Sequence, residues 1–448
     1  MSAELRPIAS PESRTEAMLA LIRDLYPLNR SITGNGVRDT LRRVGAVTPV
    51  DIQEIATGTR VFDWEVPREW NLRAGYIVDP SGHRIADAAT HNLHVMGYSV
   101  PVRRRLPLAD LRPHLHSDPA RPEVIPYRTS YYAENWGFCL RHSDLVGLQD
   151  GEYEVVIDAT LEAGSLTVGE VFIPGATTDE CLFYTHTCHP SLANDNLSGI
   201  AVLAELARWL RSRPNRLSYR IVFGPGTIGS LAWLAMHPEA RQRIRAGLVV
   251  ALAGNRAPLT YKQSRSGVAD IDRIAAAYLA NEEPGGAVIP FSAWGYDERQ
   301  FGAPGFAMPV GRLTRSPEEG YAEYHSSADD LSIIDGAALA GSLVACQTIV
   351  AALDANCRYR NTAPYGEPQL GRRGIYRQIG GPASAGLQKA MLWLLSLSDG
   401  AQDVATVYAK SGLPYADVAR AVELLRGVGL LEPLADGQGP GGSEAARV

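Results

Sequence analysis

The sequence predicts an α/β protein, with a mostly parallel or mixed sheet and helices on both faces, joined to a small β-rich domain and a C-terminal winged-helix domain. Apolar strand-like and helix-like segments alternate between residues 152 and 352. Short segments broken by Pro and Gly fill residues 49–137, and three short amphipathic helices occupy the region 380–434. Regular alternation of strand and helix is typical of a parallel sheet covered on both faces.

Length and composition agree with a protein of several domains. A chain of 448 residues is too long for one ordinary hydrophobic core. Hydrophobic residues make up 45% and charged residues 21% of the chain, as in soluble globular proteins. We expect an α/β domain (1–48 and 138–360), an inserted β-rich domain (49–137), a winged-helix domain (380–434) and a disordered tail (435–448).

Charge and cysteine usage restrict the partners and the compartment. A formal net charge of −6 and a pI near 6.0 argue against a nucleic-acid-binding surface over the whole molecule. The N-terminus lacks a basic stretch followed by an apolar run, and no stretch of about 18 consecutive apolar residues occurs. The five cysteines show no paired pattern, which favours reduced thiols. We therefore expect a cytoplasmic protein without a membrane partner. The oligomeric state stays open, with a homo-oligomer as the candidate.

The N-terminal part is predicted to form two helices at one edge of the α/β domain. Apolar side chains recur at helical spacing over residues 11–26, and Pro27 ends this helix. After a turn-rich loop, residues 37–44 form a second short helix.

The β-rich insert is predicted from short strands at 61–66, 75–78 and 92–96. It contains five of the ten histidines of the chain. Their spacing fits no tight metal site, so we expect them in exposed loops. They are His83, His91, His94, His114 and His116.

The α/β domain is predicted from strands and helices that follow one another in the chain. The strands are expected at 152–157, 169–173, 181–184, 218–223 and 247–252. The helices are expected at 200–210, 228–236, 271–281 and 337–352. These lengths are typical of a doubly covered sheet.

The last part of the chain indicates a winged helix. Helices are predicted at 387–397, 404–410 and 415–425, and residues 428–433 begin a wing. Between residues 389 and 432 four basic side chains stand against five acidic ones, which is a poor balance for binding phosphates. We therefore expect protein contacts rather than nucleic acid at this domain.

The segment 181–199 holds the strongest candidate site. An apolar strand ends at three metal-ligand side chains, His186, Cys188 and His189, and Asp195 follows in front of a helix-like run. An open α/β sheet binds ligands at the carboxyl ends of its strands, and zinc takes imidazole and carboxylate ligands. In the alternative interpretation these side chains only cap the helix and bond the turn. We favour a metal site.

Two later segments could complete this site. His325 lies 130 residues after Asp195, between an aromatic residue and small polar residues. Catalytic zinc sites often take a ligand from a distant loop, although the same segment could cap the run that begins at Leu331. Asp297 and its neighbours Glu298 and Arg299 could supply a general base, a carboxylate ligand or a substrate clamp. A solvated charge cluster at a helix start explains them equally well.

At these motifs the chain resembles the aminopeptidase-like zinc hydrolases, whose members join a peptidase-type α/β domain, an inserted small β domain and a C-terminal winged helix. The matching segments are 188–199, 225–230, 296–301, 323–329 and 371–377. The resemblance implies a site like that of the di-zinc exopeptidases, in which the loop Asp is Asp195 and the late His is His325. The first His ligand is either His186 or His189.

The resemblance also implies residues around the metal. It suggests that the substrate contacts five side chains, those of Asn194, Asn196, Tyr296, Arg299 and Tyr324.

Two positions depart from the exopeptidase pattern. Gly226 stands where the resemblance places the catalytic Glu, and Asn255 stands where an Asp ligand is expected. Glycine cannot bind a metal or move a proton, and a neutral amide is a poorer zinc ligand than a carboxylate. The remaining ligands suffice for one zinc ion with an open position, with Glu298 or Asp297 as the proton carrier.

The sequence thus predicts a zinc-dependent hydrolase of an amide or peptide bond, acting on a small peptide or an acylated amino compound. Two alternatives stay open. The scaffold could have lost catalysis and serve binding or assembly, or the same ligands could support zinc-dependent acyl transfer or cyclisation. The number of zinc ions, one or two, also stays open.

Overall fold

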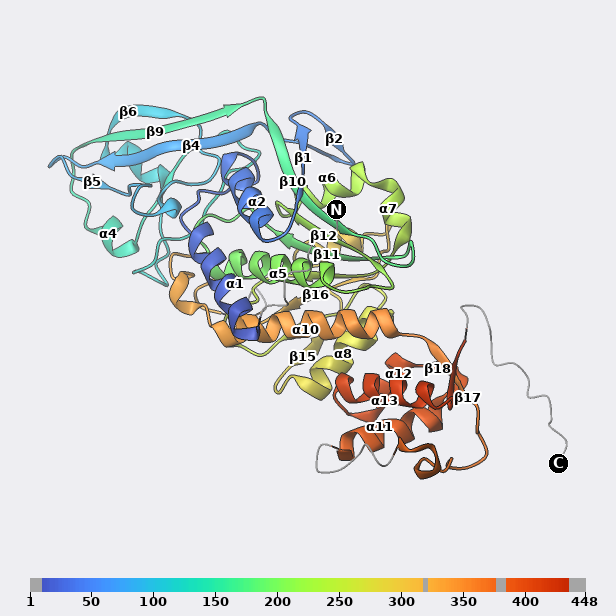
Figure 1. The fold of residues 1–448 in the computed structure, drawn as a ribbon. Helices are drawn as coiled ribbons and strands as arrows, with labels where there is room; N and C mark the ends of the chain where they lie inside the picture. Colours follow the sequence, from blue (N-terminus) through green and yellow to red (C-terminus); the bar gives the residue numbers. More distant parts are fainter. Residues whose placement is uncertain (1–9, 317–320, 376–383, 435–448) are drawn as a thin grey trace. The chain divides into compact units, whose positions relative to one another are not determined.

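The computed structural model describes residues 10–316, 321–375 and 384–434, and the chain forms two units (Figure 1). The first unit consists of Met1–Ala257 and Ser292–Leu343, and the second of Pro258–Phe291 and Val344–Val448. The tail predicted at 435–448 lies outside the described residues, as do residues 380–383 of the predicted winged helix and the end of the motif at 371–377.

The first unit contains a mixed sheet with the strand order β1-β10-β12-β11-β13-β16. Its strands are β1 (Asp51–Ala56), β10 (Ser165–Ile173), β12 (Ser218–Gly224), β11 (Glu180–His186), β13 (Ile244–Val250) and β16 (Val310–Thr314). The strands from β12 to β16 run parallel, whereas β1 pairs antiparallel with β10, and β10 with β12. β11 lies inside the sheet, and all of its residues are buried.

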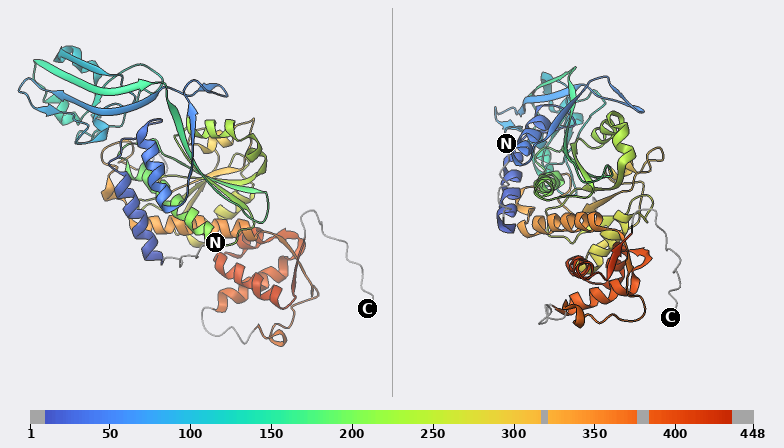
Figure 2. Two further views of the ribbon diagram at one scale, coloured as in Figure 1. Left: turned by 45° about the horizontal axis from the view of Figure 1, so that its top comes forward. Right: turned by 45° about the vertical axis from the view of Figure 1, so that its right-hand side comes forward.

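Helices cover both faces of this sheet. α1 (Pro11–Leu25), α2 (Asn35–Val47) and α5 (Gly199–Arg211) pack together on one face, and α6 (Ile228–Met236) and α7 (Pro238–Arg243) lie on the other (Figure 2). α1 begins where local chemistry favours it, because Ser10 caps its N-terminus and Pro11 occupies its first turn. The predicted α/β class, with a mostly parallel sheet covered on both faces, is confirmed.

A second sheet in the same unit has the order β5-β4-β9-β6. Its strands are β4 (Glu69–Val78), β5 (Arg84–Ile85), β6 (Val102–Pro107) and β9 (Glu152–Glu162). The shorter elements around it are β2 (Arg60–Val61), β3 (Trp64–Glu65), η1 (Asn92–His94), α3 (Leu108–Leu111), η2 (Arg112–His114), β7 (Leu115–His116), β8 (Phe138–Cys139) and α4 (His142–Val146).

The limits of this β-rich part differ from the expected ones. The strand predicted at 152–157 for the α/β domain is β9, which pairs along its length with β4. Residues 51–56, expected in the insert, form β1 at the main sheet. Segment 92–96 is not a strand, because the side chain of His91 accepts a hydrogen bond from the Leu93 amide and starts the turn η1. Period-two patterning indicates a strand but not its neighbour.

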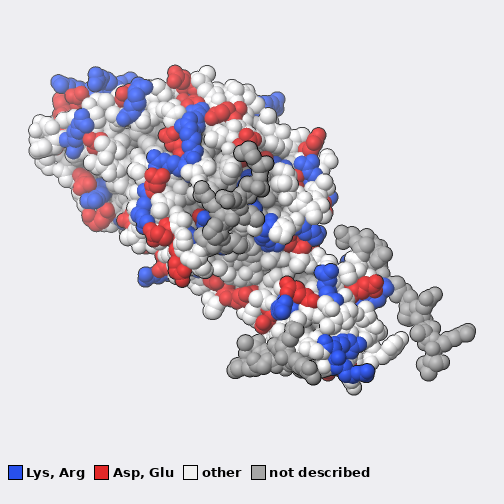
Figure 3. Space-filling model, in the orientation of Figure 1, with Lys and Arg blue, Asp and Glu red and all other residues white. Residues whose placement is uncertain are grey.

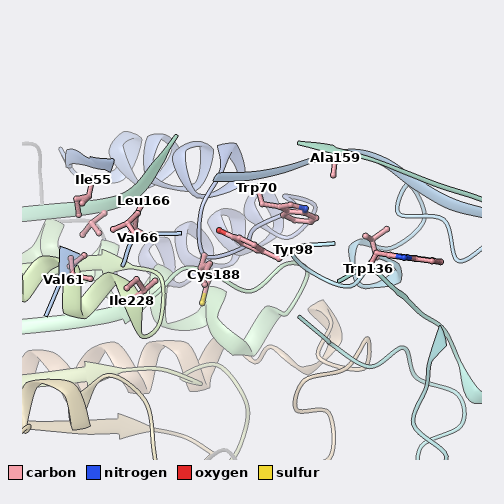
Figure 4. Packing of buried hydrophobic residues seen from close by; sticks show 14 of the residues in the cluster. Ile55, Val61, Val66, Trp70, Tyr98, Trp136, Ala159, Leu166, Cys188 and Ile228 are labelled. Carbon is pink, nitrogen blue, oxygen red and sulfur yellow. The ribbon is translucent and has the colours of Figure 1, made fainter. Parts of the chain in front are cut away.

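One hydrophobic cluster joins the second sheet to the main one. Trp70 stacks on Tyr98 with ring centroids 5.8 Å apart. Figure 4 shows Cys188 in this cluster, with Trp70 and Tyr98 on one side and Ile228 on the other. The loop that follows β11 is therefore anchored in the core that both sheets share.

The second unit contains the winged helix together with residues 258–291, which come earlier in the chain. The helices are α8 (Asp270–Glu282), α11 (Ser384–Leu397), α12 (Val404–Ser411) and α13 (Tyr415–Gly427), and the strands are β14 (Thr260–Lys262), β15 (Ala287–Ile289), β17 (Arg358–Asn361), β18 (Asp399–Asp403) and β19 (Leu431–Pro433). β17 lies between β18 and β19. The last helix of the α/β pattern, α10 (Gly336–Ala355), runs from the first unit into the second.

Residues 258–291, expected in the α/β domain, belong to the second unit because side chains of α8 bind the winged helix. Arg273 pairs with Asp403 at 2.6 Å, and Glu282 accepts a hydrogen bond from the Tyr415 amide at 2.9 Å. The helical periodicity of residues 271–281 predicts a helix but not the domain that this helix contacts.

Surface composition agrees with the balance seen in the sequence. Figure 3 shows basic and acidic side chains interspersed over the visible face of the first unit. On α13 the exposed Arg420 pairs with Glu423 at 2.8 Å. Among the described residues, α10 is long and apolar enough to cross a membrane, and 56% of its most apolar window is buried, as in the core helix of a globular domain.

A buried ion network ties three strands of the main sheet together. Arg220 on β12 donates to Glu180 on β11 at 2.7 Å and also pairs with Glu170 on β10. The indole of Trp233 donates to Glu170 at 2.6 Å, and Arg243 pairs with Glu180 at 2.6 Å. Buried carboxylates need such partners, because an unpaired charge in the interior is costly.

We expect Arg220→Met to lower the free energy of unfolding by about 3–5 kcal/mol, because the substitution keeps the volume but leaves two buried carboxylates without their shared cation. Urea unfolding followed by circular dichroism measures the loss. The matched control is Arg42→Met, which removes an exposed pair with Asp39. An exposed pair contributes at most about 1 kcal/mol, so equal losses in the two variants would contradict the role of the network.

Candidate metal centre

The centre forms where β11 ends inside the main sheet. His186 is the last residue of β11, and its chain then passes through the loop 187–192 into the short helix η3 (Ala193–Ser198) and α5. A buried parallel strand presents its carboxyl end at the edge of the sheet, where helix N-termini and loops converge. This brings His186, His189 and Asp195 into one place.

The carboxylate of Asp195 lies among three imidazoles and is fully buried. Its Oδ1 is 2.7 Å from Nε2 of His186 and 3.8 Å from Nδ1 of His189. Its Oδ2 is 3.0 Å from Nε2 of His325, which comes from the loop after β16. The structure therefore brings together all four predicted ligands, and both alternatives for the first histidine are present.

These donor atoms fit a metal ion. The ligand atoms of His186, His189 and Asp195 lie within 4.8 Å of one another. Oδ2 of Asp195 and Nε2 of His325 are buried and close, yet they lack hydrogen-bond geometry with each other or with another described residue. Oδ1 of Asp195 is hydrogen-bonded to Nε2 of His186, whereas its Oδ2 and Nε2 of His325 are buried atoms that a shared metal ion would satisfy.

The electrostatics of the centre favour the ligand forms. Burial lowers the pKa of His189 to about 3, so its imidazole is neutral at physiological pH. Burial opposes ionisation of Asp195, but the neighbouring imidazoles, His189 first, hold the pKa of this carboxyl well below its ordinary value. Burial raises the pKa of Cys188 to about 12, which keeps it a neutral thiol and a poor ligand.

A second carboxylate holds the loop that carries Asp195. Asp329 accepts hydrogen bonds from the backbone amides of Asn194 at 2.6 Å and Asp195 at 3.0 Å. Because Asp329 follows His325 on the same loop, it fixes the two ligand loops to each other. Burial raises the pKa of Asp329 to about 7.

The structure contradicts the prediction that Asn194 and Asn196 bind substrate. Oδ1 of Asn194 accepts from the Gly254 amide at 2.8 Å, and Oδ1 of Asn196 accepts from the Leu252 amide at 3.1 Å. Both side chains are buried and neither lines the cavity beside the centre. They bind backbone because the loop after β13 would otherwise bury unpaired amides.

Arg30 also supports the centre, although no sequence motif marked it. The side chain is 1% exposed, and its Nε donates to the carbonyl oxygen of His189 at 2.9 Å. Its Nη1 donates to the Leu25 carbonyl at 2.6 Å, which ties the His189 loop to the end of α1.

A cavity of about 370 Å³ adjoins the centre and is lined by the three imidazoles and by aromatic side chains. Tyr296 stacks on His186 at a centroid distance of 5.2 Å, and Tyr324 stacks on His325 at 3.9 Å. Both tyrosines, which the sequence predicts as substrate contacts, line the cavity. Tyr127, from the connection between β7 and β8, contacts the rings of His189 and His325 with centroid distances of 5.1 and 5.2 Å. The sequence did not predict this residue.

The side chains of the predicted charge cluster at 297–299 lie in different surroundings. Asp297 lines the cavity and accepts a hydrogen bond from Oγ of Ser230 at 2.7 Å. Burial raises its pKa to about 6. Glu298, at the start of α9 (Glu298–Phe301), instead faces Arg312 in the interior at 3.7 Å. Consecutive residues at a helix start point in different directions. Neither Glu298, the predicted proton carrier, nor Arg299, the predicted substrate clamp, lines the cavity, so the geometry supports Asp297 rather than these two.

The two departures from the exopeptidase pattern lie in different surroundings. A Cβ atom on Gly226 would lie 3.2 Å from Oδ2 of Asp297 and 3.4 Å from Cβ of His186. Asn255 does not line the cavity, and its amide donates to Oγ of Ser316 at 2.5 Å. Position 226 therefore belongs to the centre, and its missing side chain leaves room that Asp297 faces.

Known proteins resemble this chain over most of its length. Residues 19–356 match the model of the family described as a domain of unknown function, DUF4910, and residues 357–433 match a winged helix-turn-helix. A putative polysaccharide biosynthesis protein with an aminopeptidase-like domain, from Clostridium acetobutylicum, is 43% identical over 413 residues, which cover 92% of this chain and 95% of the relative.

Solved structures agree with this match. A putative peptidase from Clostridium acetobutylicum superposes with a TM-score of 0.88 at 40% identity, covering 95% of this chain and 98% of the other. A zinc aminopeptidase from Bacillus subtilis shares the fold with a TM-score of 0.55 at 14% identity, covering 76% of this chain and 94% of the other. The chain therefore belongs to the DUF4910 family, with an aminopeptidase-like fold and a C-terminal winged helix.

Proposed function

We propose that this chain is a zinc-dependent hydrolase that cleaves an amide or peptide bond in a small peptide or an acylated amino compound. The observation that supports this proposal is the convergence of His186, His189 and Asp195 at the end of β11, beside a cavity that Asp297 also lines. Convergent ligands next to a concave site with a titratable group are the features of a metallohydrolase.

His186, His189 and Asp195 are the residues that would hold the metal. Three protein ligands are typical of a catalytic zinc site, which keeps a further position for water or substrate. His325 approaches the second oxygen of Asp195 and would complete the ligand set or hold a second ion. A zinc ion at this site supplies a Lewis acid for an amide carbonyl or a water molecule.

Asp297 is the candidate proton carrier. Its carboxylate lines the cavity, and Ser230 orients it through a hydrogen bond of 2.7 Å to Oδ1, which leaves Oδ2 toward Gly226. A carboxylate in this position can take a proton from an attacking water and return it to the leaving amine. Asp297 thus offers a carboxylate beside the position where the related exopeptidases suggest a Glu.

A scaffold without catalysis is the second candidate, because Gly226 and Asn255 depart from the exopeptidase pattern. The zinc content and the effect of Asp297→Asn on kcat separate the candidates, since a binding scaffold needs neither a metal nor a titratable carboxylate in its cavity.

We expect protein purified without chelator or metal-affinity resin to contain about one zinc ion per chain, or two if His325 starts a second site. His186→Ala should lose this zinc because it removes one of three converging ligands. Elemental analysis measures the metal. His83→Ala, which changes an exposed histidine of the β-rich part, is the control and should keep the wild-type content. Wild-type protein without metal would contradict the proposal.

We expect Asp297→Asn to lower kcat by about 10²–10⁴-fold while the zinc content stays unchanged, because the amide keeps the shape but cannot carry a proton. Amine release from dipeptides and acylated amino compounds measures the rate. Asp330→Asn is the control, because that carboxylate caps η4 (Leu331–Ile333) outside the cavity lining. A variant at Asp297 with wild-type kcat would remove this residue from the mechanism.

A further inference from the structure

The β-rich part supplies one wall of the cavity. Its segment Ile125–Tyr127 runs antiparallel to the loop of His325. The Tyr127 amide donates to the His325 carbonyl at 2.8 Å, and the Ser327 amide donates to the Ile125 carbonyl at 2.9 Å. Because this segment is bonded to the loop of a candidate ligand, the residues that follow it have fixed positions at the site.

This wall presents connected hydroxyl groups. The hydroxyls of Tyr127 and Tyr131 are 2.9 Å apart, and the hydroxyl of Tyr131 also interacts with Thr129. All three residues line the cavity. A hydroxyl group can both donate and accept hydrogen bonds, so this wall suits a ligand with hydroxyl and carbonyl groups.

The charges of the cavity do not suit a free ammonium group. Of the described residues that line it, Asp297 alone carries a carboxylate, and Arg128 adds a positive charge. A buried ammonium needs a carboxylate partner. If Asp297 paired with the ammonium of a peptide N-terminus, it could not also carry the proton of the reaction. A neutral, hydroxyl-bearing substrate avoids this conflict.

Three exposed aromatic residues lie near cavity-lining residues, two as their neighbours in the chain and one through a ring contact. Tyr132 follows the lining residue Tyr131 and is 51% exposed, and its ring lies 5.4 Å from that of Trp64, which is 46% exposed. Trp294 precedes the lining residue Gly295 and is 70% exposed. Flat aromatic faces carry negative potential and can pack against the polarised C–H faces of sugar rings.

We propose that the substrate is an N-acylated amino sugar in a short oligosaccharide, with the acylated sugar in the cavity and the next sugar on Trp64, Tyr132 and Trp294. The inference rests on the proposed amide hydrolysis. Water adds its oxygen to the acyl carbon, the C–N bond breaks, and the proton that the water gives up passes through Asp297 to the leaving nitrogen. The products are a carboxylate and a free amino sugar, which takes up one proton to become an ammonium.

The test measures binding and cleavage of N,N′-diacetylchitobiose by full-length, zinc-containing protein. Titration calorimetry should detect binding of the disaccharide. This binding should weaken about tenfold in Tyr131→Phe, because the sugar group that bonds the Tyr131 hydroxyl would be left unpaired in the complex. Trp294→Ala should weaken binding of the disaccharide but not of N-acetylglucosamine. Tyr76→Phe, on the second sheet and outside the cavity lining, should bind as the wild type does. Each variant should keep the wild-type zinc content.

Acetate release from the disaccharide and amine release from leucine p-nitroanilide then compare the two substrate classes by kcat/KM. A higher value for the disaccharide supports the inference. A higher value for the anilide, or calorimetric binding unaffected by Tyr131→Phe, would overturn it while leaving amide hydrolysis in place. Binding of the disaccharide without cleavage of either compound would instead overturn the proposed hydrolase function and leave sugar recognition standing.

Discussion

The buried carboxylate of Asp195 is the group on which the site depends. A charge with no solvent exposure is stable only if other groups compensate it. Here the compensation comes from imidazoles on separate segments, at the end of β11, on the following loop and on the loop of His325. Asp329 adds backbone hydrogen bonds that lock the Asp195 loop. The sheet, the β11 loop and the late loop are therefore organised around one side chain, and a metal ion would add its charge at the same point.

The β-rich part contributes to this arrangement and is not a separate appendage. Its segment at Ile125–Tyr127 is bonded to the His325 loop, and the ring of Tyr127 contacts two of the imidazoles. The hydrophobic cluster that includes Trp70 and Tyr98 reaches Cys188 beside the ligands. Core packing and site geometry are thus coupled, since a shift of the second sheet would move both the cavity wall and the ligand loop.

The sequence could predict the fold class and the convergence of the candidate ligands, because both leave local signals. A strand that ends in His186, with Asp195 in front of a helix, is readable from neighbouring residues. Arg30 and Tyr127 left no such signal, because each acts through contacts with residues more than 60 positions away. Glu298 lies away from the cavity, which the sequence could not show, because adjacency to Asp297 says nothing about side-chain direction at a helix start. The edge of the β-rich part was misplaced for a related reason, since a strand pattern does not name its partner.

Gly226 fixes the position of a carboxylate that comes from another segment of the chain. Catalysis requires a carboxylate at a certain place, and the segment that supplies it is secondary. A side chain at position 226 would contact Oδ2 of Asp297 at its Cβ atom, so the present position of Asp297 depends on the glycine. Ser230, in the first turn of α6, donates to the other oxygen and holds the carboxylate there. The glycine, Ser230 and Asp297 therefore form one local arrangement, in which the space left at position 226 and the hydrogen bond from Ser230 together fix the carboxylate of Asp297.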